Sequence, residues 1–173
     1  MVRGRKNPLF IGLPGRVRKA RKTAGLTRKA VVQRIGGDQS LVRQIEDGQR
    51  VPTVGTITRL AVALGVTASW LSYGIGEPNS EIGVASCEGM GLRIQMVRVQ
   101  LGYTKAALAR LAGLSPSAFA KIENGGQSGV DVVEAIAQVI GVSPAWLAYG
   151  IAPQVLTPIR RGRPPLQSSA PGR

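Results

Sequence analysis

The sequence contains no histidine and only one cysteine, Cys87, among its 173 residues. A single cysteine excludes an internal disulfide framework and fits a reducing compartment, so we expect a cytoplasmic protein. No histidine, one cysteine and nine scattered acidic residues leave no material for a metal cluster or a catalytic triad. We therefore expect no catalytic residue, no metal site and no cofactor.

Aromatic residues and long apolar runs are also scarce. Aromatics make up 4% of the chain, which favours small helical domains over a β-sandwich. No apolar run approaches the roughly 20 residues that a membrane-spanning helix needs. The first residues are basic, but their apolar stretch, LFIGL, is shorter than the apolar core of a signal peptide, which needs about 7 to 15 residues. We therefore expect neither a membrane segment nor a signal peptide.

Acidic residues are few, and the excess of basic residues is uneven along the chain. The net charge is +14, and residues 1–76 hold 14 Lys and Arg against 3 acids, whereas residues 89–152 hold 5 against 3. A strongly basic first half indicates a polyanionic partner, most simply nucleic acid. The alternative is a basic surface that only keeps the protein in solution.

What the sequence does contain is an internal repeat. GVTASWLSYGIG at residues 65–76 returns as GVSPAWLAYGIA at residues 141–152. The offset between matching positions is 77 residues up to a Glu-x-Gly turn and 76 after it, as expected if a loop lost one residue. The expected organisation is a basic N-terminal arm at 1–12, a first unit at 13–76, a linker at 77–89, a second unit at 90–152 and a basic tail at 153–173.

Glycines and capping residues divide each unit into five short helices. In the first unit we expect a helix that stops before Gly25, a second at 28–35 capped by Thr27, a third at 39–46 capped by Asp38, a fourth from Pro52-Thr53 to Leu64, and a fifth capped by Thr67. The second unit has the same punctuation at Gly102, Thr104, Gly113, Ser115, Gly125, Gly141 and Ser143. The pattern predicts an all-α fold.

Two of these helices and the turn between them carry a family resemblance. TRKAVVQRIGGDQSLVRQIEDG in the first unit and TKAALARLAGLSPSAFAKIENG in the second resemble the Cro-type (XRE-type) helix-turn-helix of phage and bacterial repressors. The resemblance extends over most of both units. It implies two five-helix, lambda-repressor-like domains in tandem, followed by a disordered basic tail. It further implies a bacterial or phage-encoded, nucleoid-associated regulator of transcription, a repressor, that binds specific double-stranded DNA.

The resemblance also assigns roles to residues of the first unit. Its third helix becomes the recognition helix, which lies in the major groove and reads base edges. The outward positions that we expect to contact bases are Gln39, Ser40, Arg43 and Gln44. Arg pairs well with guanine and Gln with adenine. The basic residues placed for phosphate contact are Arg28, Lys29 and Arg50.

Two pairs of opposite charge recur at one spacing. Arg21 and Glu46 are 25 residues apart, as are Arg98 and Glu123. The resemblance implies that each pair forms an ion pair that ties the first helix of its unit to the third. Arginine suits this position because its planar fork meets a carboxylate through two hydrogen bonds.

The second unit has a poorer reading face. Its matching positions are Pro116, Ser117, Ala120 and Lys121, of which only Ser117 and Lys121 offer DNA a polar group. Lys105 is placed for phosphate. We expect this unit either to bind DNA weakly or to bind a protein partner or a second copy of the chain.

The linker and the tail allow further contacts. About 14 flexible residues span roughly 20 Å on average, or about 45–50 Å when extended. Half-sites one turn apart are separated by about 34 Å, so one chain could reach both, while a homodimer through the second unit is equally allowed. In the tail, Arg161, Gly162, Arg163 and Pro164 resemble an AT-hook for the minor groove, or belong to an inert basic tail.

The aromatic pairs Trp70/Tyr73 and Trp146/Tyr149 have a three-residue spacing that favours packing in the core, where we expect each pair to seal its unit against the first helix. Two rivals to the repressor remain. One is an antitoxin or accessory regulator whose second domain binds a protein, and the other is a nucleoid protein indifferent to sequence.

Overall fold

The computed structural model describes residues 8–79, 87–151 and 154, and this part of the chain is helical, without strands. A 3-10 helix, η1 (Leu9–Gly12), precedes the first unit. The helices of the first unit are α1 (Leu13–Thr23), α2 (Arg28–Ile35), α3 (Leu41–Glu46), α4 (Val54–Leu64) and α5 (Ala68–Tyr73). Those of the second unit are α6 (Met90–Gln100), α7 (Lys105–Leu111), α8 (Pro116–Glu123), α9 (Val130–Ile140) and α10 (Pro144–Tyr149).

Five of the ten α-helices in the described residues begin after a hydroxyl side chain that caps them: Thr27, Thr53, Thr104, Ser115 and Ser143. The side chain of Thr27 accepts a hydrogen bond from Ala30 N (3.1 Å), and that of Ser115 accepts one from Ala118 N (3.2 Å). Such a bond satisfies one of the N–H groups that the first turn of a helix leaves without a partner. Helices also end at the glycines where the sequence predicted an end. Gly65 and Gly141 end α4 and α9 with φ of 65° and 73°, a backbone region that glycine adopts without strain.

Two of the expected caps are wrong. The third helix begins at Leu41, not at Gln39, because the Asp38 carboxylate accepts from Ser40 N (2.6 Å) and closes a separate turn before the helix. Gln39 and Ser40 therefore lie in that turn. Thr67 precedes α5 but does not cap it, and its hydroxyl donates instead to the carbonyl of Glu77 (3.0 Å).

Each unit buries one apolar side chain from each of its five helices. All of the following are 0% exposed: Val17, Val31, Ile45, Ile57 and Leu71 in the first unit, and Ile94, Leu108, Phe119, Val133 and Leu147 in the second. Burial of one such side chain contributes about 1.5–3 kcal/mol relative to leaving it in water. The core therefore holds α2–α3 and α7–α8 as fixed pairs.

In each unit an arginine at an equivalent position holds the last helix in place. Arg16 donates to the carbonyls of Leu71 (2.9 Å) and Ser72 (2.6 Å) at the end of α5. Its counterpart Arg93 donates to the carbonyls of Leu147 and Ala148, each at 2.9 Å, at the end of α10. These carbonyls lack partners within the helix, so each arginine satisfies the last turn and ties it to the first helix.

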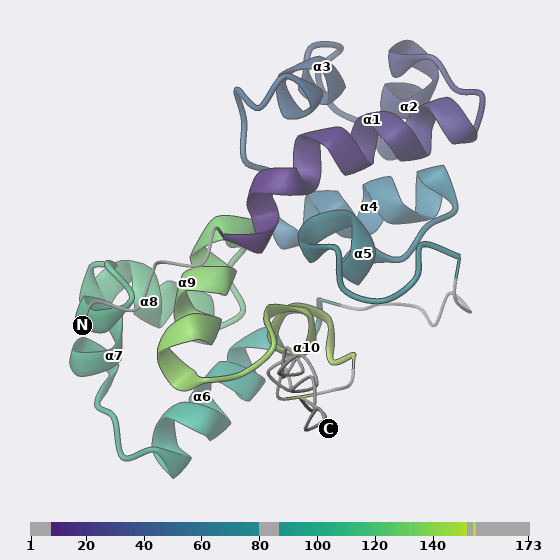
Figure 1. The fold of residues 1–173 in the computed structure, drawn as a ribbon. Helices are drawn as coiled ribbons and strands as arrows, with labels where there is room; N and C mark the ends of the chain where they lie inside the picture. Colours follow the sequence, from purple (N-terminus) through teal and green to yellow (C-terminus); the bar gives the residue numbers. More distant parts are fainter. Residues whose placement is uncertain (1–7, 80–86, 152–153, 155–173) are drawn as a thin grey trace, which may run out of the picture.

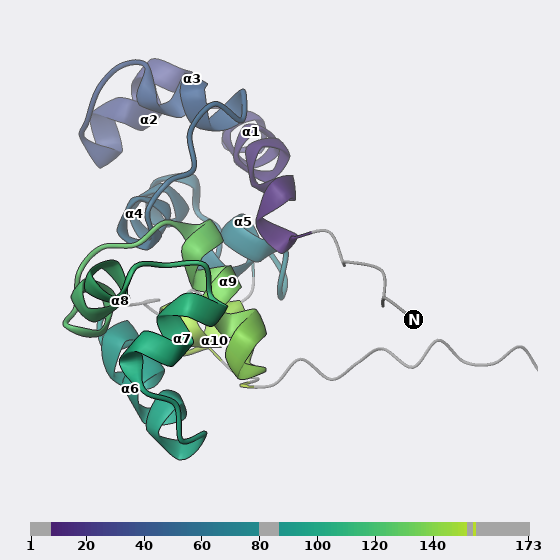
Figure 2. The same ribbon diagram turned by 90° about the vertical axis from the view of Figure 1, so that its left-hand side faces the viewer.

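The two units pack directly against each other. Figure 1 shows α5 and α10 side by side at the middle of the molecule, with the α2–α3 and α7–α8 pairs on either side of this contact. Figure 2, turned by 90°, again places α2–α3 at one end of the molecule and α7–α8 beyond α4 and α5. The sequence-based expectation of two units joined only by a flexible linker is therefore incomplete.

Both tyrosines of the aromatic pairs lie in this contact. Tyr73 donates to the carbonyl of Val130 (3.1 Å), and the hydroxyls of Tyr149 and Ser72 share a hydrogen bond of 2.6 Å. Burial raises the pKa of Tyr73 and of Tyr149 above its ordinary value. The expectation that they seal each unit against its own first helix is wrong for the hydroxyls, which join one unit to the other.

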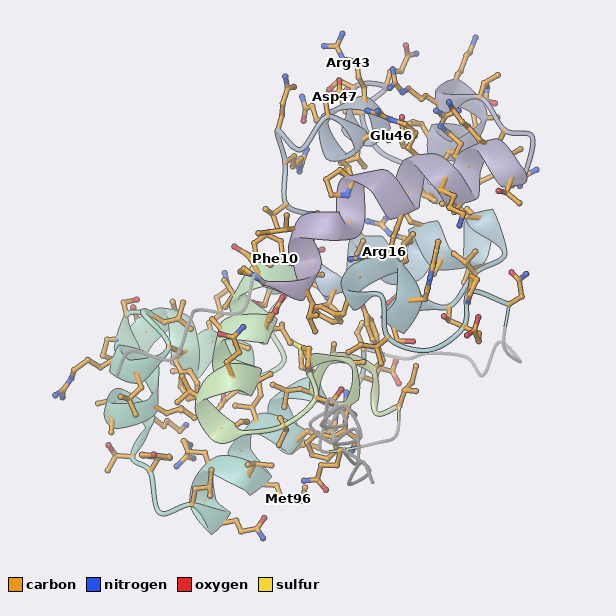
Figure 3. The ribbon with its side chains drawn as sticks, viewed as in Figure 1. Phe10, Arg16, Arg43, Glu46, Asp47 and Met96 are labelled. Atoms are coloured by element: carbon orange, nitrogen blue, oxygen red, sulfur yellow. The ribbon has the colours of Figure 1, made fainter. Side chains whose placement is uncertain are left out.

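The N-terminal arm takes part as well. Residues 9–12, expected as part of a basic arm, form η1. The backbone N–H groups of Leu9 and Phe10 donate to the two carboxylate oxygens of Glu134, at 2.7 and 3.0 Å. Glu134 lies on α9 and is 3% exposed. Figure 3 shows Phe10 where the first unit meets the second.

Candidate nucleic-acid interface

The turn between α2 and α3 depends on two glycines. Gly36 and Gly37 have φ of 70° and 118°, which side-chain-bearing residues rarely adopt. They reverse the chain after Ile35 so that Leu41 and Val42 of α3 become buried, at 8% and 0% exposure. The buried face of α3 is thereby fixed, and its opposite face is directed outward.

The four positions expected to contact bases share this outward face. Gln39 and Arg43 are exposed, and Ser40 and Gln44 are partly exposed. The Gln44 side-chain amide donates to the Ser40 hydroxyl (3.0 Å), which holds both side chains in place. Figure 3 shows Arg43 projecting away from the body of the molecule, at the end farthest from the second unit. The structure therefore brings these four residues together on one accessible surface.

Behind this surface, Glu46 anchors α3 to α1. Arg21 donates to its carboxylate through Nε (2.6 Å) and through a second guanidinium nitrogen (3.2 Å). This is the ion pair that the resemblance implied, with the two bonds expected of an arginine. The Glu46 side chain is 0% exposed. Burial disfavours its ionised form, but hydrogen bonds from Arg21 and Arg28 outweigh burial, so the pKa of Glu46 is lowered. Figure 3 shows Glu46 between α1 and α3.

The second unit repeats this anchor, but here the arginine makes one hydrogen bond to the carboxylate and not the expected two. Arg98 Nε lies 2.6 Å from Glu123 Oε1, and the two side chains are 10% and 2% exposed. In both units the arginine also donates to a backbone carbonyl five residues on, Leu26 in the first and Tyr103 in the second, each at 2.9 Å. The pair therefore also fixes the turn into the second helix of each unit.

Two of the residues expected at phosphate take part in these anchors. Arg28 Nε lies 2.8 Å from Glu46 Oε2, and Lys105 Nζ lies 3.3 Å from Glu123 Oε2. These ion pairs were not predicted from the sequence. The signal that could have found them is a second shared spacing, because Arg28 and Lys105 each precede the buried glutamate of their unit by 18 residues. Their side chains stay 40% and 48% exposed, so contact with phosphate remains a prediction for both.

Other basic groups surround the reading face of the first unit, and one of them, Arg18, also contacts Glu46, with its Nε 3.9 Å from Glu46 Oε2. Lys29 is exposed at the start of α2, where backbone N–H groups point outward, and Arg50 is exposed in the loop after α3. Arg18 forms an ion pair with Asp47 (3.1 Å) at the C-terminal end of α3. Lys29 and Arg50 are therefore the better placed of the expected phosphate contacts.

The corresponding face of the second unit is mostly small or apolar. Pro116 begins α8, Ser117 and Lys121 are exposed, and Ala120 is partly buried. The Ser117 hydroxyl lies 3.2 Å from that of Ser115, the residue that caps α8. Lys121 is thus the single cation among the four positions that match the reading face of α3.

Some expected sites lie outside the described residues. These are the AT-hook-like residues Arg161, Gly162, Arg163 and Pro164. Within the described ranges, no group of three or more Cys, Asp or Glu side chains is arranged to hold a metal ion. No helix in the described ranges has both the length and the apolar character needed to cross a membrane.

An exposed helix held at the end of a glycine turn, within a basic five-helix unit, defines the class of helix-turn-helix DNA-binding proteins. Comparison with protein families supports this assignment twice. Residues 13–71 match a family described as helix-turn-helix domain, and residues 94–147 match one described as helix-turn-helix. The chain belongs to the Cro-type (XRE-type) helix-turn-helix proteins, with two such domains in tandem, and is a DNA-binding regulator of transcription.

These families typically consist of regulators without enzymatic activity. No curated protein and no solved structure matched the chain.

Proposed function

We propose that the protein is a sequence-specific repressor that inserts α3 and the turn before it, residues 39–46, into the major groove of double-stranded DNA. Residues 13–76 and 90–152 are then its two domains. The observation that carries this proposal is the outward face of α3, where amide, hydroxyl and guanidinium groups are held together over a buried ion pair. Repression is the outcome that the resemblance to phage and bacterial repressors favours.

The chemistry of this face suits base reading. Arg43 can donate two hydrogen bonds to guanine, and an amide such as Gln39 or Gln44 can pair with adenine. Preorganisation supports it as well, because Gln44 is already held by Ser40 (3.0 Å) and has less freedom to lose on binding. Lys29 and Arg50 would contact phosphates on either side and set the position of α3 on the duplex.

Two substitutions separate base reading from phosphate contact. Gln44→Ala should relax preference at about one base position and weaken the cognate site by roughly 1–3 kcal/mol, while binding to random duplex stays unchanged. Lys29→Ala should weaken all duplexes alike and reduce the dependence of binding on salt by about one unit. The measurement is a titration of cognate and random duplexes at several salt concentrations.

A matched control is available in the second unit. Lys121 occupies the position equivalent to Gln44, so Lys121→Ala should leave base preference unchanged and behave like a loss of phosphate contact. If Gln44→Ala and Lys29→Ala had the same effect on cognate and random duplexes, α3 would not be the reading element.

A second candidate function is that of an accessory regulator whose second unit binds a protein, as an antitoxin does. One observation favours it. Leu92, Met96 and Val99 lie on one face of α6 and are 69%, 53% and 61% exposed. The equivalent positions of α1 are glycine and two lysines. Figure 3 shows Met96 on the outer side of α6, at the end of the molecule away from α3.

A further inference from the structure

The contact between the units contains a pair of equivalent backbone hydrogen bonds. Val54 N donates to the carbonyl of Ser128 (2.9 Å), and Val130 N donates to the carbonyl of Pro52 (3.2 Å). Val54 and Val130 are equivalent in the repeat, as are Pro52 and Ser128, at an offset of 76 residues. Each hydrogen bond is therefore the image of the other, around an antiparallel bridge between the residues at the centre of the two segments.

Such reciprocal contacts define a local two-fold axis. In a two-fold interface, residue i of one unit contacts residue j of the other, and j contacts i. We extend this local axis to the helices that the repeat makes equivalent, so that a rotation of 180° relates α3 to α8. The bridging segments come shortly after α3 and α8 in the chain, and Figure 1 shows the α2–α3 and α7–α8 pairs on either side of the contact between the units.

Buried side chains fix the pair in this arrangement. Tyr73 and Tyr149 are equivalent residues, they are 2% and 5% exposed, and each makes a hydrogen bond to the opposite unit. The Glu134 carboxylate adds a one-sided clamp on η1, because its equivalent in the first unit is Thr58. The surface around α5 and α10 is therefore occupied within one chain.

The two reading faces on either side of the axis differ. In α3 and the turn before it all four outward positions are polar, whereas in the second unit proline and alanine stand in place of Gln39 and Arg43. Lys29 is likewise matched by alanine in the second unit. The contact is symmetric at its backbone bridge, whereas the two units differ in their capacity to read bases.

We infer that the two units of one chain act as a preassembled pair that binds two inverted half-sites about one helical turn apart, reads bases in the half-site under α3, and contacts mainly backbone in the half-site under α8. This rests on the proposed function of α3. A symmetric dimer selects a palindrome, since operator symmetry follows protein symmetry. This pair selects an asymmetric site and needs only one chain per duplex.

The test is a spacing series with the full-length chain. Duplexes would carry the full site, the α3 half-site ending short of the region under α8, or the full site with a short run of phosphates in the second half neutralised about 5, 10 or 15 base pairs from the centre of the first. We expect the full site to bind about tenfold more tightly than the half-site, since the second contact is intramolecular. Neutralisation about 10 base pairs away should return binding to the half-site level, because it removes the phosphates that α8 contacts. Neutralisation about 5 or 15 base pairs away, on the opposite face of the duplex, should leave binding unchanged, and one chain should bind each full duplex.

Three results would overturn the inference: equal affinity for full site and half-site, the same effect of neutralisation at all three positions, or two chains on one full duplex. A flexible tether between independent units would give the second of these results. Failure of the proposed function looks different, because then the α3 half-site itself would bind no better than random duplex.

Proline substitutions test the interface directly. Val54 and Val130 are the first residues of α4 and α9, a helix position where proline is tolerated. A residue that precedes proline must be extended, and both are: φ and ψ are −74° and 159° for Thr53 and −67° and 151° for Gly129. The double variant Val54→Pro/Val130→Pro thus loses both bridging hydrogen bonds. It should bind the full site about tenfold more weakly and the half-site unchanged.

The matched control is Ala68→Pro. Ala68 is the first residue of α5, outside the bridge, and its equivalent in the second unit is already Pro144. This control should bind both duplexes as the wild type does. If the double variant also bound the full site as the wild type does, the preassembled pair would be excluded. Helical circular dichroism checks that the double variant folds, and if it does not, the spacing series alone decides.

Discussion

At the scale of single residues, Glu46 holds the most consequential position in the first unit. Its buried carboxylate receives hydrogen bonds from Arg21 on α1 and Arg28 on α2, while its own backbone belongs to α3. The three helices that present the reading face therefore meet at one side chain. A buried ion pair of this kind adds little net stability, but removing one partner is costly because the other partner is left buried.

Glu46→Gln should destabilise the protein at neutral pH by about 1.5–3 kcal/mol, the usual contribution of a hydrogen bond to a charged group. It should also change the pH dependence. The pKa of Glu46 is lowered in the folded state, so its contribution is present above the unfolded pKa of about 4.3 and is lost as the pH falls through the folded value. Urea unfolding between pH 3 and about 7 measures both effects.

In this series the acid limb of the wild type should be steeper than that of Glu46→Gln. Asp47→Asn is the control, since Asp47 is the adjacent acid and its side chain is 37% exposed. It should stay within about 0.5 kcal/mol of the wild type, as exposed substitutions usually do. Parallel pH curves for the wild type and Glu46→Gln would show that the anchor does not stabilise the folded state.

The sequence was informative about residues where a spacing recurred. The 25-residue spacing of Arg21 and Glu46 returns in the second unit, and the structure contains both ion pairs. The participation of Arg28 and Lys105 was missed because a base at the start of a helix has an obvious alternative use at phosphate. Composition does not distinguish an ion pair with the buried glutamate from contact with phosphate. The choice depends on where the glutamate side chain of the third helix points in the folded unit.

At the scale of helices, the start of α3 could not be predicted from the local sequence pattern, whereas the bounds of α2 could. The extent of α2, 28–35, follows from its cap and its glycines and agrees with the structure. The start of α3 does not, because the Asp38 carboxylate can either cap a helix or close a turn on Ser40 N. The hydrogen bond to Ser40 lowers the pKa of Asp38, in keeping with an ionised carboxylate in that turn.

The exposed face of α6 separates the two candidate functions. Met96→Lys/Val99→Lys reproduces the Lys19 and Lys22 of the first unit at matching positions. Because both side chains are more than half exposed, the free energy of unfolding should change by no more than about 0.5 kcal/mol, and binding to the selected duplex should be retained. A reporter gene placed behind the selected site should stay repressed.

One result of this experiment would favour the accessory-regulator function. If the double variant bound the duplex normally but failed to repress the reporter, the apolar face of α6 would be needed for contact with another protein. The accessory-regulator function would then replace the simple repressor. Leu111→Lys on α7 serves as the control, since Leu111 is 56% exposed and lies outside the α6 face.

At the scale of the whole molecule, the repeat predicted two alike units but not their pairing. The bridging hydrogen bonds join backbone groups of Val54, Val130, Pro52 and Ser128. Every residue except proline has the same backbone groups, so the sequence carries no side-chain pattern from which these bonds could be predicted. The tyrosines had a simpler explanation as core residues of their own unit. Only the packing of α5 on α10 shows that their hydroxyls cross to the other unit.

The asymmetry between the units is likewise a property of the pair. Each alone is an ordinary small helical domain, with a modest core and little stability to spare. Packed together they share a buried contact, and we propose that the first unit reads bases while the second adds backbone contacts to the same duplex. The higher positive charge of the first half of the chain agrees with this division, because the reading half also carries most of the attraction to phosphate.

The most direct test of the account is the selection of bound sites from a pool of random duplexes by the full-length chain. The account predicts enrichment of one well-defined half-site, flanked about 10 to 10.5 base pairs away by a region that is protected from cleavage but weakly constrained in sequence. Enrichment of no motif at low salt, or equal binding of every duplex, would contradict the claim that α3 reads DNA.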